Sequence, residues 1–342
     1  MKDRLDWIDF AKGLAIILVV YRHIMIGLKR AGLDVHQAYV IANEVVYTFR
    51  MPLFFILTGI FISRSLAKRG PGHFVLNKFK TLIYPYLIWA FIQVSLQVAL
   101  NEYTNANRGW IDYLYILVHP RAIDQLWFLY ALFNNCMIFL LVNKLTRNRK
   151  ILNLLIALVF HYLATLVPQI DLLKDALYYF VFLTLGDLIS QYLFMEKYRD
   201  IYKSPRLFAG LLALFIPGQI LWFRNPHMNT FLFALIEIIG CFLMLNISFM
   251  VGSKKALRFI KIAGNYSLQI YVMHVIISSA IRIALIKIFS IQSVPLLMIL
   301  GVTAGCFLPV YLYKRFKKHG AWILFTPDNP FSIQTKKQVQ AV

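Results

Sequence analysis

The chain is a succession of long apolar runs separated by short polar stretches. The first run, residues 5–26, carries no charged residue from Gly13 to Tyr21, which is what lipid requires of a spanning helix. Nine further runs have a similar length, and none is interrupted by a soluble domain or a long linker. The ten predicted spans cover roughly residues 10–28, 43–63, 80–100, 125–143, 151–167, 176–195, 206–222, 229–250, 265–286 and 295–313.

This pattern predicts an all-α polytopic membrane protein with about ten transmembrane helices. Residues 1–342 are expected to form a single integral-membrane domain, in which residues 314–342 are a short basic tail. Residues 1–28 are not expected to be a cleaved signal peptide, because their apolar run is long and no small-residue cleavage site follows it. The three cysteines fall inside predicted spans, so no disulfide framework is expected.

Composition and charge agree with a membrane protein and set its orientation. The chain is 60% hydrophobic and has a net charge of +21. If the N-terminus is placed in the cytoplasm, 25 of the 36 basic residues fall in inner segments and 7 in outer loops. This asymmetry predicts that both termini are cytoplasmic, and it makes a nucleic-acid partner unnecessary as an explanation of the charge. The other four basic residues, Lys12, Arg22, Arg50 and Arg282, lie inside spans.

Two ionisable side chains share one face of the first predicted helix. Lys12 and His23 are eleven residues apart, which is about 20° more than three helical turns and about 16 Å along the axis. Such groups usually face a bundle interior or a wet cavity. The alternative is that Lys12 extends to the interface and His23 is a hydrogen-bonded structural residue.

Arg50 lies in the outer half of the second span, two residues before Pro52. Its distance from the outer end of its helix is close to that of His23, and a short loop joins the two spans. We therefore expect His23 and Arg50 to share a cavity. The alternative is an arginine that binds the carbonyl groups of a helix broken at Pro52.

Lys78 and Lys80 precede the third span at the cytoplasmic side, and Trp127 begins the fourth at the outer side. The two lysines could hold an anionic cofactor, or they could only satisfy the charge rule of membrane topology. Trp127 is typical of an aromatic belt at the membrane interface.

Polar residues also occur in the later spans. A carboxylate such as Glu237 needs a cation or a proton to be tolerated in lipid, and Arg282 at a comparable depth is a possible partner. His274 falls near the middle of its span, where a lone histidine is more often structural than catalytic. These residues predict a polar bundle interior, which both enzymes and transporters possess.

Taken together and in order, four motifs resemble the acyltransferase 3 family, and within it the branch of fucose 4-O-acetylase-like proteins. They are LDWIDFAKG…VVYRH, which contains Asp9, Lys12 and His23, then FRMPLFFILTG, LWFLYALF and GNYSLQIYVMH. The set extends over nearly the whole chain. Many family members carry paired arginines before the third span, where this chain has Lys78 and Lys80.

The resemblance implies an enzyme of the bacterial inner membrane that uses cytoplasmic acyl-CoA, commonly acetyl-CoA, as the acyl donor. The acceptor would be a hydroxyl of a cell-surface carbohydrate or of its lipid-linked precursor, and no metal is expected. It further implies that His23 is the catalytic residue and that Lys12 belongs to the same site. Two alternatives remain open: a transporter or flippase of a glycan or lipid-linked sugar, and a structural subunit of a polysaccharide export complex.

Overall fold

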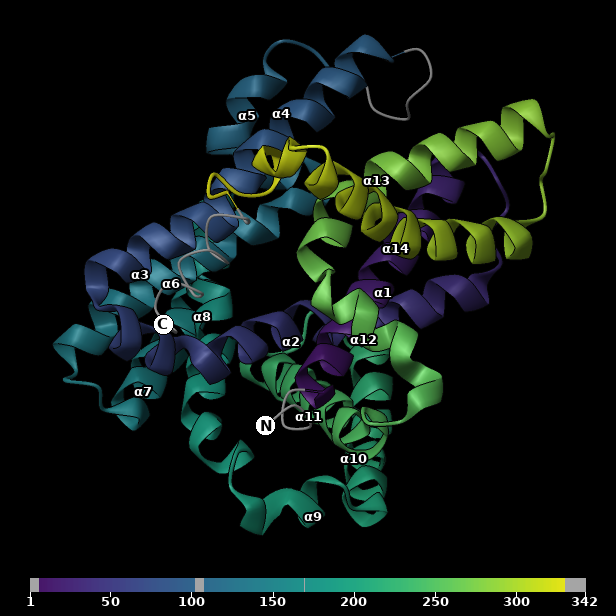
Figure 1. Ribbon diagram of the computed structural model, residues 1–342. Helices are drawn as coiled ribbons and strands as arrows, with labels where there is room; N and C mark the ends of the chain where they lie inside the picture. Colours follow the sequence, from purple (N-terminus) through teal and green to yellow (C-terminus); the bar gives the residue numbers. More distant parts are fainter. Residues whose placement is uncertain (1–5, 102–107, 169, 330–342) are drawn as a thin grey trace.

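The computed structural model describes residues 6–101, 108–168 and 170–329, and within these ranges the protein is helical and has no strand (Figure 1). The long helices are α1 (Asp6–Arg30), α2 (Gln37–Arg69), α4 (Tyr84–Ala99), α6 (Trp127–Leu145), α7 (Lys150–Leu163), α8 (Asp171–Leu193), α10 (Pro205–Arg224), α11 (Thr230–Val251), α13 (Ser267–Ile283) and α14 (Val294–Lys318). The short helices are α3 (Pro71–Lys78), α5 (Asp112–Val118), α9 (Arg199–Tyr202) and α12 (Arg258–Asn265). Single π or 3₁₀ turns join several of them: η2 (Phe79–Ile83), η3 (Pro120–Ala122), η4 (Asp124–Leu126), η5 (Glu196–Tyr198), η6 (Lys255–Leu257), η7 (Ala284–Ile288) and η8 (Ala321–Leu324).

In the described part of the chain, eight helical segments are long and apolar enough to cross a membrane. The prediction of an all-helical, multi-pass membrane protein is therefore confirmed. The two remaining expected spans correspond to α7 and α8. Helix α7 has 14 residues, fewer than the roughly 20 that usually cross a bilayer, and α8 carries charged residues near both of its ends. The count of ten spans and the cytoplasmic termini remain predictions.

Contacts of α8 with the segments before and after α6 favour ten spans. Arg121 of the loop before α6 donates to the carboxylate of Asp175 near the start of α8 (Nε to Oδ2, 2.8 Å), and His119 lies 3.6 Å from Asp171. Toward the other end of α8, Asp187 accepts from Lys150, which begins α7 (Nζ to backbone O, 2.8 Å). The start of α8 therefore lies beside the loop before α6, and its later part lies beside the start of α7.

We expect reporter fusions to give opposite results at two positions. A reporter fused after Val167, between α7 and α8, should be active only in its external form, because α7 and α8 then cross the membrane as a pair. A reporter fused after Lys318 should be active only in its cytoplasmic form. A cytoplasmic signal at position 167 would show that α7 and α8 do not cross, and the number of spans would fall to eight.

Helix α1 is the central element of the bundle, and it packs against α2, α11, α12, α13 and α14 (Figure 1). Its closest approach is to α12, where a Cβ added at Gly13 would collide with the Ile260 carbonyl and one added at Gly264 with the Asp9 carbonyl. Small residues allow membrane helices to approach in this way. The contact fixes α1 along its N-terminal half, so its C-terminal half presents His23 at a defined place.

The chain beyond α14 folds back against the N-terminal part of α4. The carbonyl of Ile323 accepts from the Tyr84 hydroxyl (2.6 Å), and that of Leu324 accepts from the Trp89 indole (2.8 Å). Asp328 pairs with Lys80 at 2.6 Å. Part of the predicted tail therefore packs on the domain, while residues 330–342 lie outside the described ranges.

Candidate functional site

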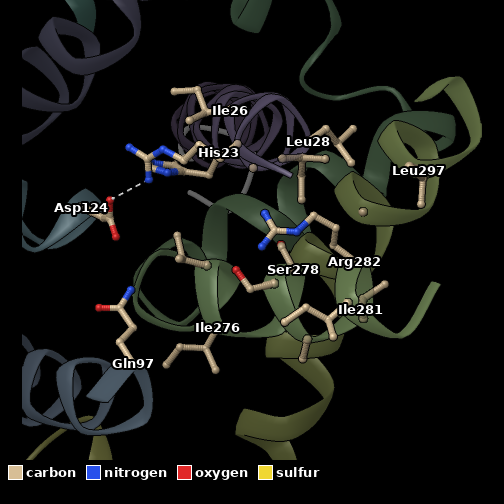
Figure 2. A pocket seen from close by; sticks show the side chains of 18 of the residues that line it. His23, Ile26, Leu28, Gln97, Asp124, Ile276, Ser278, Ile281, Arg282 and Leu297 are labelled. Carbon is tan, nitrogen blue, oxygen red and sulfur yellow. Dashed lines mark ion pairs between the residues drawn. The ribbon is translucent and has the colours of Figure 1, made fainter. Parts of the chain in front are cut away.

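His23 lies in the C-terminal half of α1, where two cavities meet. The larger, about 600 Å³, lies among α1, α2, α6, α8 and α11, and the smaller, about 330 Å³, lies among α1, α4, α13 and α14. Both are lined by His23, Ile26, Arg30 and Asp124. Figure 2 shows the smaller cavity, with His23 on α1 facing Ser278 and Arg282 of α13.

The larger cavity is strongly polar and rich in aromatic side chains. Its walls carry cations, acids and aromatic residues in comparable numbers. The cations are Arg22, Arg30, Arg50, Arg121 and Lys174, and the acids are Asp124, Asp171, Asp175 and Glu237. The aromatic residues are Tyr47, Trp127, Tyr178, Tyr179, Phe233 and Tyr271. Several directional donors and acceptors among flat apolar faces are typical of a site for a small polar molecule.

The structure brings His23 and His274 together, although they are far apart in sequence. Their ring centroids are 5.1 Å apart in an edge-to-face arrangement. His274 is fully buried, and its Nδ1 lies 3.0 Å from the Ile270 carbonyl and 2.9 Å from the Tyr271 carbonyl. Because carbonyl oxygens only accept, Nδ1 carries the proton of the neutral ring, and Nε2 is unprotonated. His274 thus packs beside His23 with a fixed tautomer.

Arg50 lines the same cavity as His23, as the sequence predicted. It is only 2% exposed, and its Nη1 donates to the Asn43 side chain at 3.3 Å and to the Leu18 carbonyl at 3.5 Å. The guanidinium also lies over the Tyr47 ring, 5.8 Å from its centroid. The bond to Leu18 ties this cation to α1, one turn before His23. Its Nε has no protein partner among the described residues.

Trp127 and Glu237 line this cavity too, from α6 and α11. The indole ring of Trp127 lies beneath the Arg121 guanidinium, 4.1 Å from its centroid to Cζ. Glu237 is 4% exposed and accepts from the Tyr178 hydroxyl at 2.8 Å. The anticipated pairing of Glu237 with Arg282 is wrong, because Arg282 lines the smaller cavity, where its guanidinium lies against Gly27. The two residues share a depth but face different neighbouring helices.

The remaining predicted residues lie in the N-terminal half of α1 and before α4, and none of them lines either cavity. Lys12 is close enough to Asp9 and Lys78 for their charges to interact. The ammonium of Lys78 lies 5.5 Å from the centre of the Phe74 ring. Lys80 is paired with Asp328. Helix α1 therefore connects two regions, a basic one beside its N-terminal half and the His23 cavities beside its C-terminal half.

The sequence interpretation missed several residues of the larger cavity. Asp124 and Gln125 belong to the short turn η4. The position of this turn depends on Arg108, which donates to the Asp112 carboxylate (2.7 Å) and to the Ala122 carbonyl (2.5 Å). Tyr178 and Tyr179 lie on α8 among other apolar residues. One signal was present: charged residues cluster in the first turn of α8, which is unusual for a lipid-facing helix end. Among the described residues, no three metal-ligating side chains are placed to hold an ion together.

Comparison with known proteins gives a match over most of the chain. A family model of the acyltransferase 3 type, described as an acyltransferase domain, matches residues 5–314. The nodulation protein NolL of Sinorhizobium fredii is 27% identical over 126 residues, which are 36% of this chain and 32% of that protein. NolL of Mesorhizobium japonicum is 28% identical over 138 residues, 40% of this chain and 35% of that protein. The aligned part thus spans about a third of either relative. No solved structure matches the chain.

Proposed function

Because the chain belongs to the acyltransferase 3 family, we propose that it is a membrane O-acyltransferase of the bacterial inner membrane. It moves an acetyl or related acyl group from cytoplasmic acyl-CoA to a hydroxyl of a cell-surface carbohydrate or of its lipid-linked precursor. The observation that carries this proposal is the position of His23. It stands in the wall of a polar cavity, on the helix whose cytoplasmic half carries Lys12.

The larger cavity supports a carbohydrate acceptor. A sugar presents hydroxyl groups at its edge and C–H groups on its faces, so it needs both polar partners and flat apolar surfaces. Glu237, Asp175 and Gln125 offer acceptors or donors for hydroxyl groups, and Trp127 and Tyr179 offer ring faces. The volume of about 600 Å³ is in the usual range for a small-molecule site.

The proposed reaction uses His23 as a general base. Its neutral imidazole takes the proton from the acceptor hydroxyl as that oxygen attacks the thioester carbonyl carbon. The tetrahedral intermediate then collapses, the C–S bond breaks, and the departing CoA sulfur takes the proton that His23 removed from the acceptor, which returns His23 to its neutral form. Negative charge develops on the carbonyl oxygen during attack, and a fixed cation beside it lowers the barrier. Arg50 is proposed as this cation, because it lines the same cavity as His23 and is bonded to α1 through the Leu18 carbonyl.

The donor is proposed to enter from the cytoplasm past the basic residues of α1 and the third span. Lys12, Lys78 and Lys80 supply charges that suit the phosphates of CoA. The ion pair of Lys80 with Asp328 would have to open if Lys80 were to take part in that binding. Asp9, beside Lys12, is proposed to orient the lysine rather than to contact the donor.

Thioester consumption separates an acyltransferase from a transporter. Membranes that contain the protein should transfer label from [¹⁴C]acetyl-CoA to a glycan fraction or hydrolyse it, and membranes with His23→Ala should do neither. NMR spectra of surface glycans should lose O-acyl signals when the gene is deleted. Glycan movement across vesicles without any thioester consumption would instead identify a transporter or flippase.

A further inference from the structure

The smaller cavity differs from the larger one in the chemistry of its walls, although both reach His23. We propose that it holds the first segment of the hydrocarbon chain of a lipid-linked acceptor, with the anionic phosphate linkage of that lipid on Arg282. This inference rests on the proposed function, and it selects the lipid-linked precursor over the finished, water-exposed glycan as the acceptor.

The walls of the smaller cavity are mainly aliphatic. Leu28 of α1, Ile276 of α13 and Leu297 of α14 contribute (Figure 2). Leu96 of α4 and Leu100, which directly follows α4, also line the cavity. Leu96 and Leu100 are 39% and 46% exposed. The packing of the bundle therefore does not close the cavity at these two leucines, which gives a hydrocarbon chain a route from the bilayer.

Arg282 places a positive charge in this apolar setting. Its guanidinium lies beside Gly27 of α1, where any added Cβ would collide with it. Among the described residues no carboxylate lies within ion-pair distance of Arg282, whereas Arg30 pairs with Asp124 at 3.6 Å. A guanidinium inside a membrane bundle usually has an anionic or carbonyl partner, and its planar fork suits a phosphate.

The position of the smaller cavity along the helices decides between two ligands that carry a hydrocarbon chain, the acyl-CoA donor and a lipid-linked acceptor. Its residues come from the outer ends of α1, α4 and α13 and from the outer start of α14. The acyl chain of a CoA donor arrives from the cytoplasmic side, so it would have to pass His23 to reach this place. A lipid of the outer leaflet reaches it directly, with its phosphate near the level of Arg282.

The volume of the smaller cavity and its connection to the larger cavity also fit a lipid-linked acceptor. About 330 Å³ is near the lower end of the range of about 300 to 1,000 Å³ for small-molecule sites, so only part of a long chain enters. The rest remains in the bilayer beyond Leu96 and Leu100. Because His23, Ile26, Arg30 and Asp124 line both cavities, a sugar attached to that phosphate would extend into the larger cavity and pass His23.

Binding can be tested without any acyl donor, so a failure here is distinct from a failure of the proposed function. Native mass spectrometry of the purified full-length protein in detergent would compare undecaprenyl phosphate with undecaprenol, phosphatidylglycerol and inorganic phosphate. Undecaprenyl phosphate should bind at least about tenfold more tightly than undecaprenol, since a hydrogen bond to a charged group typically contributes that much or more. It should also bind more tightly than inorganic phosphate, which has no hydrocarbon chain, and than phosphatidylglycerol, whose two acyl chains suit a cavity of about 330 Å³ less well than one chain.

Four variants localise the binding. Ala280→Trp adds a large side chain at an exposed position in the wall of the smaller cavity and should weaken undecaprenyl phosphate binding about tenfold. Ile299→Trp is the matched control, because Ile299 is 65% exposed on α14 and does not line the cavity. Arg282→Gln should remove the preference for undecaprenyl phosphate over undecaprenol, and Arg282→Lys should keep part of it.

Equal binding of phosphatidylglycerol would overturn the proposal and identify a groove for bulk lipid. The proposal would also be overturned if neither Ala280→Trp nor Arg282→Gln weakened undecaprenyl phosphate binding, because the lipid would then bind elsewhere. If Ala280→Trp does not fold, Leu100→Trp at the exposed rim serves the same purpose. Acyl transfer to a water-soluble glycan with no polyprenyl phosphate binding would leave the enzyme intact and reject this acceptor.

Discussion

Replacing His23 with alanine should lower acyl transfer by about 10²- to 10⁴-fold, the usual contribution of a residue that moves a proton in the transition state. The protein should still insert and accumulate, because His23 is only partly buried and lies between two cavities rather than in a packed layer. The measurement is transfer from labelled acetyl-CoA in membranes, normalised to the amount of protein.

The control for this variant is His227→Ala, since His227 is exposed in the loop between α10 and α11. It should keep the parent's activity and its expression level. Full activity of His23→Ala would reject His23 as the base. Loss of the protein from the membrane would instead support the structural interpretation, in which the contact with the His274 ring stabilises the bundle.

The depth of polar residues along their helices could be predicted from the sequence. A helix rises about 1.5 Å per residue, and the alternating charge of the loops indicates which end of each span is outside. Those two facts were enough to place His23 and Arg50 together, and Trp127 and Glu237 line the same cavity. The motif that contains His274 also meets the first helix, where the two histidine rings pack together.

The direction in which each residue faces could not be predicted in the same way. Glu237 and Arg282 have a similar depth, yet α11 packs on α2 and α10 while α13 packs on α14 and α1. Their side chains therefore enter different cavities, and Glu237 is bonded by Tyr178 of α8. Neighbour relations of this kind depend on the packing of all helices at once, which no single apolar run encodes.

The irregular segments were also beyond the sequence pattern. Turn η4 supplies Asp124 to both cavities, and its place depends on the side-chain contacts of Arg108. The return of the C-terminal segment onto α4, which pairs Asp328 with Lys80, joins residues 248 positions apart. Short polar segments carry no period from which such contacts could be inferred.

Arg50→Gln should lower kcat by about 10²- to 10³-fold with a much smaller change in KM, the typical loss when a donor to a developing oxyanion is removed. Arg50 is suited to this role because its guanidinium is buried in the wall of the His23 cavity and is held by Asn43 and the Leu18 carbonyl. A cation held in place before the reaction needs no reorganisation as charge develops. Arg50→Lys should retain part of the rate, since lysine keeps the charge but loses the planar fork.

Arg64→Gln is the matched control, because Arg64 lies on the same helix at its cytoplasmic end, over the ring of Phe194. It should alter neither kcat nor KM. Whether Arg50→Gln changes kcat or the acceptor KM distinguishes two possible roles of Arg50. A rise in the acceptor KM at constant kcat would mean that Arg50 binds the substrate and its transition state equally. In that case Arg50 would be an acceptor-binding residue, and Lys12 would be the next cation to test.

Because Lys12 lines neither cavity, a role for it would require the donor to bring the thioester toward the cytoplasmic half of α1. An unchanged rate in Lys12→Gln, together with a lowered kcat in Arg50→Gln, would place the reacting thioester in the outer half, beside His23.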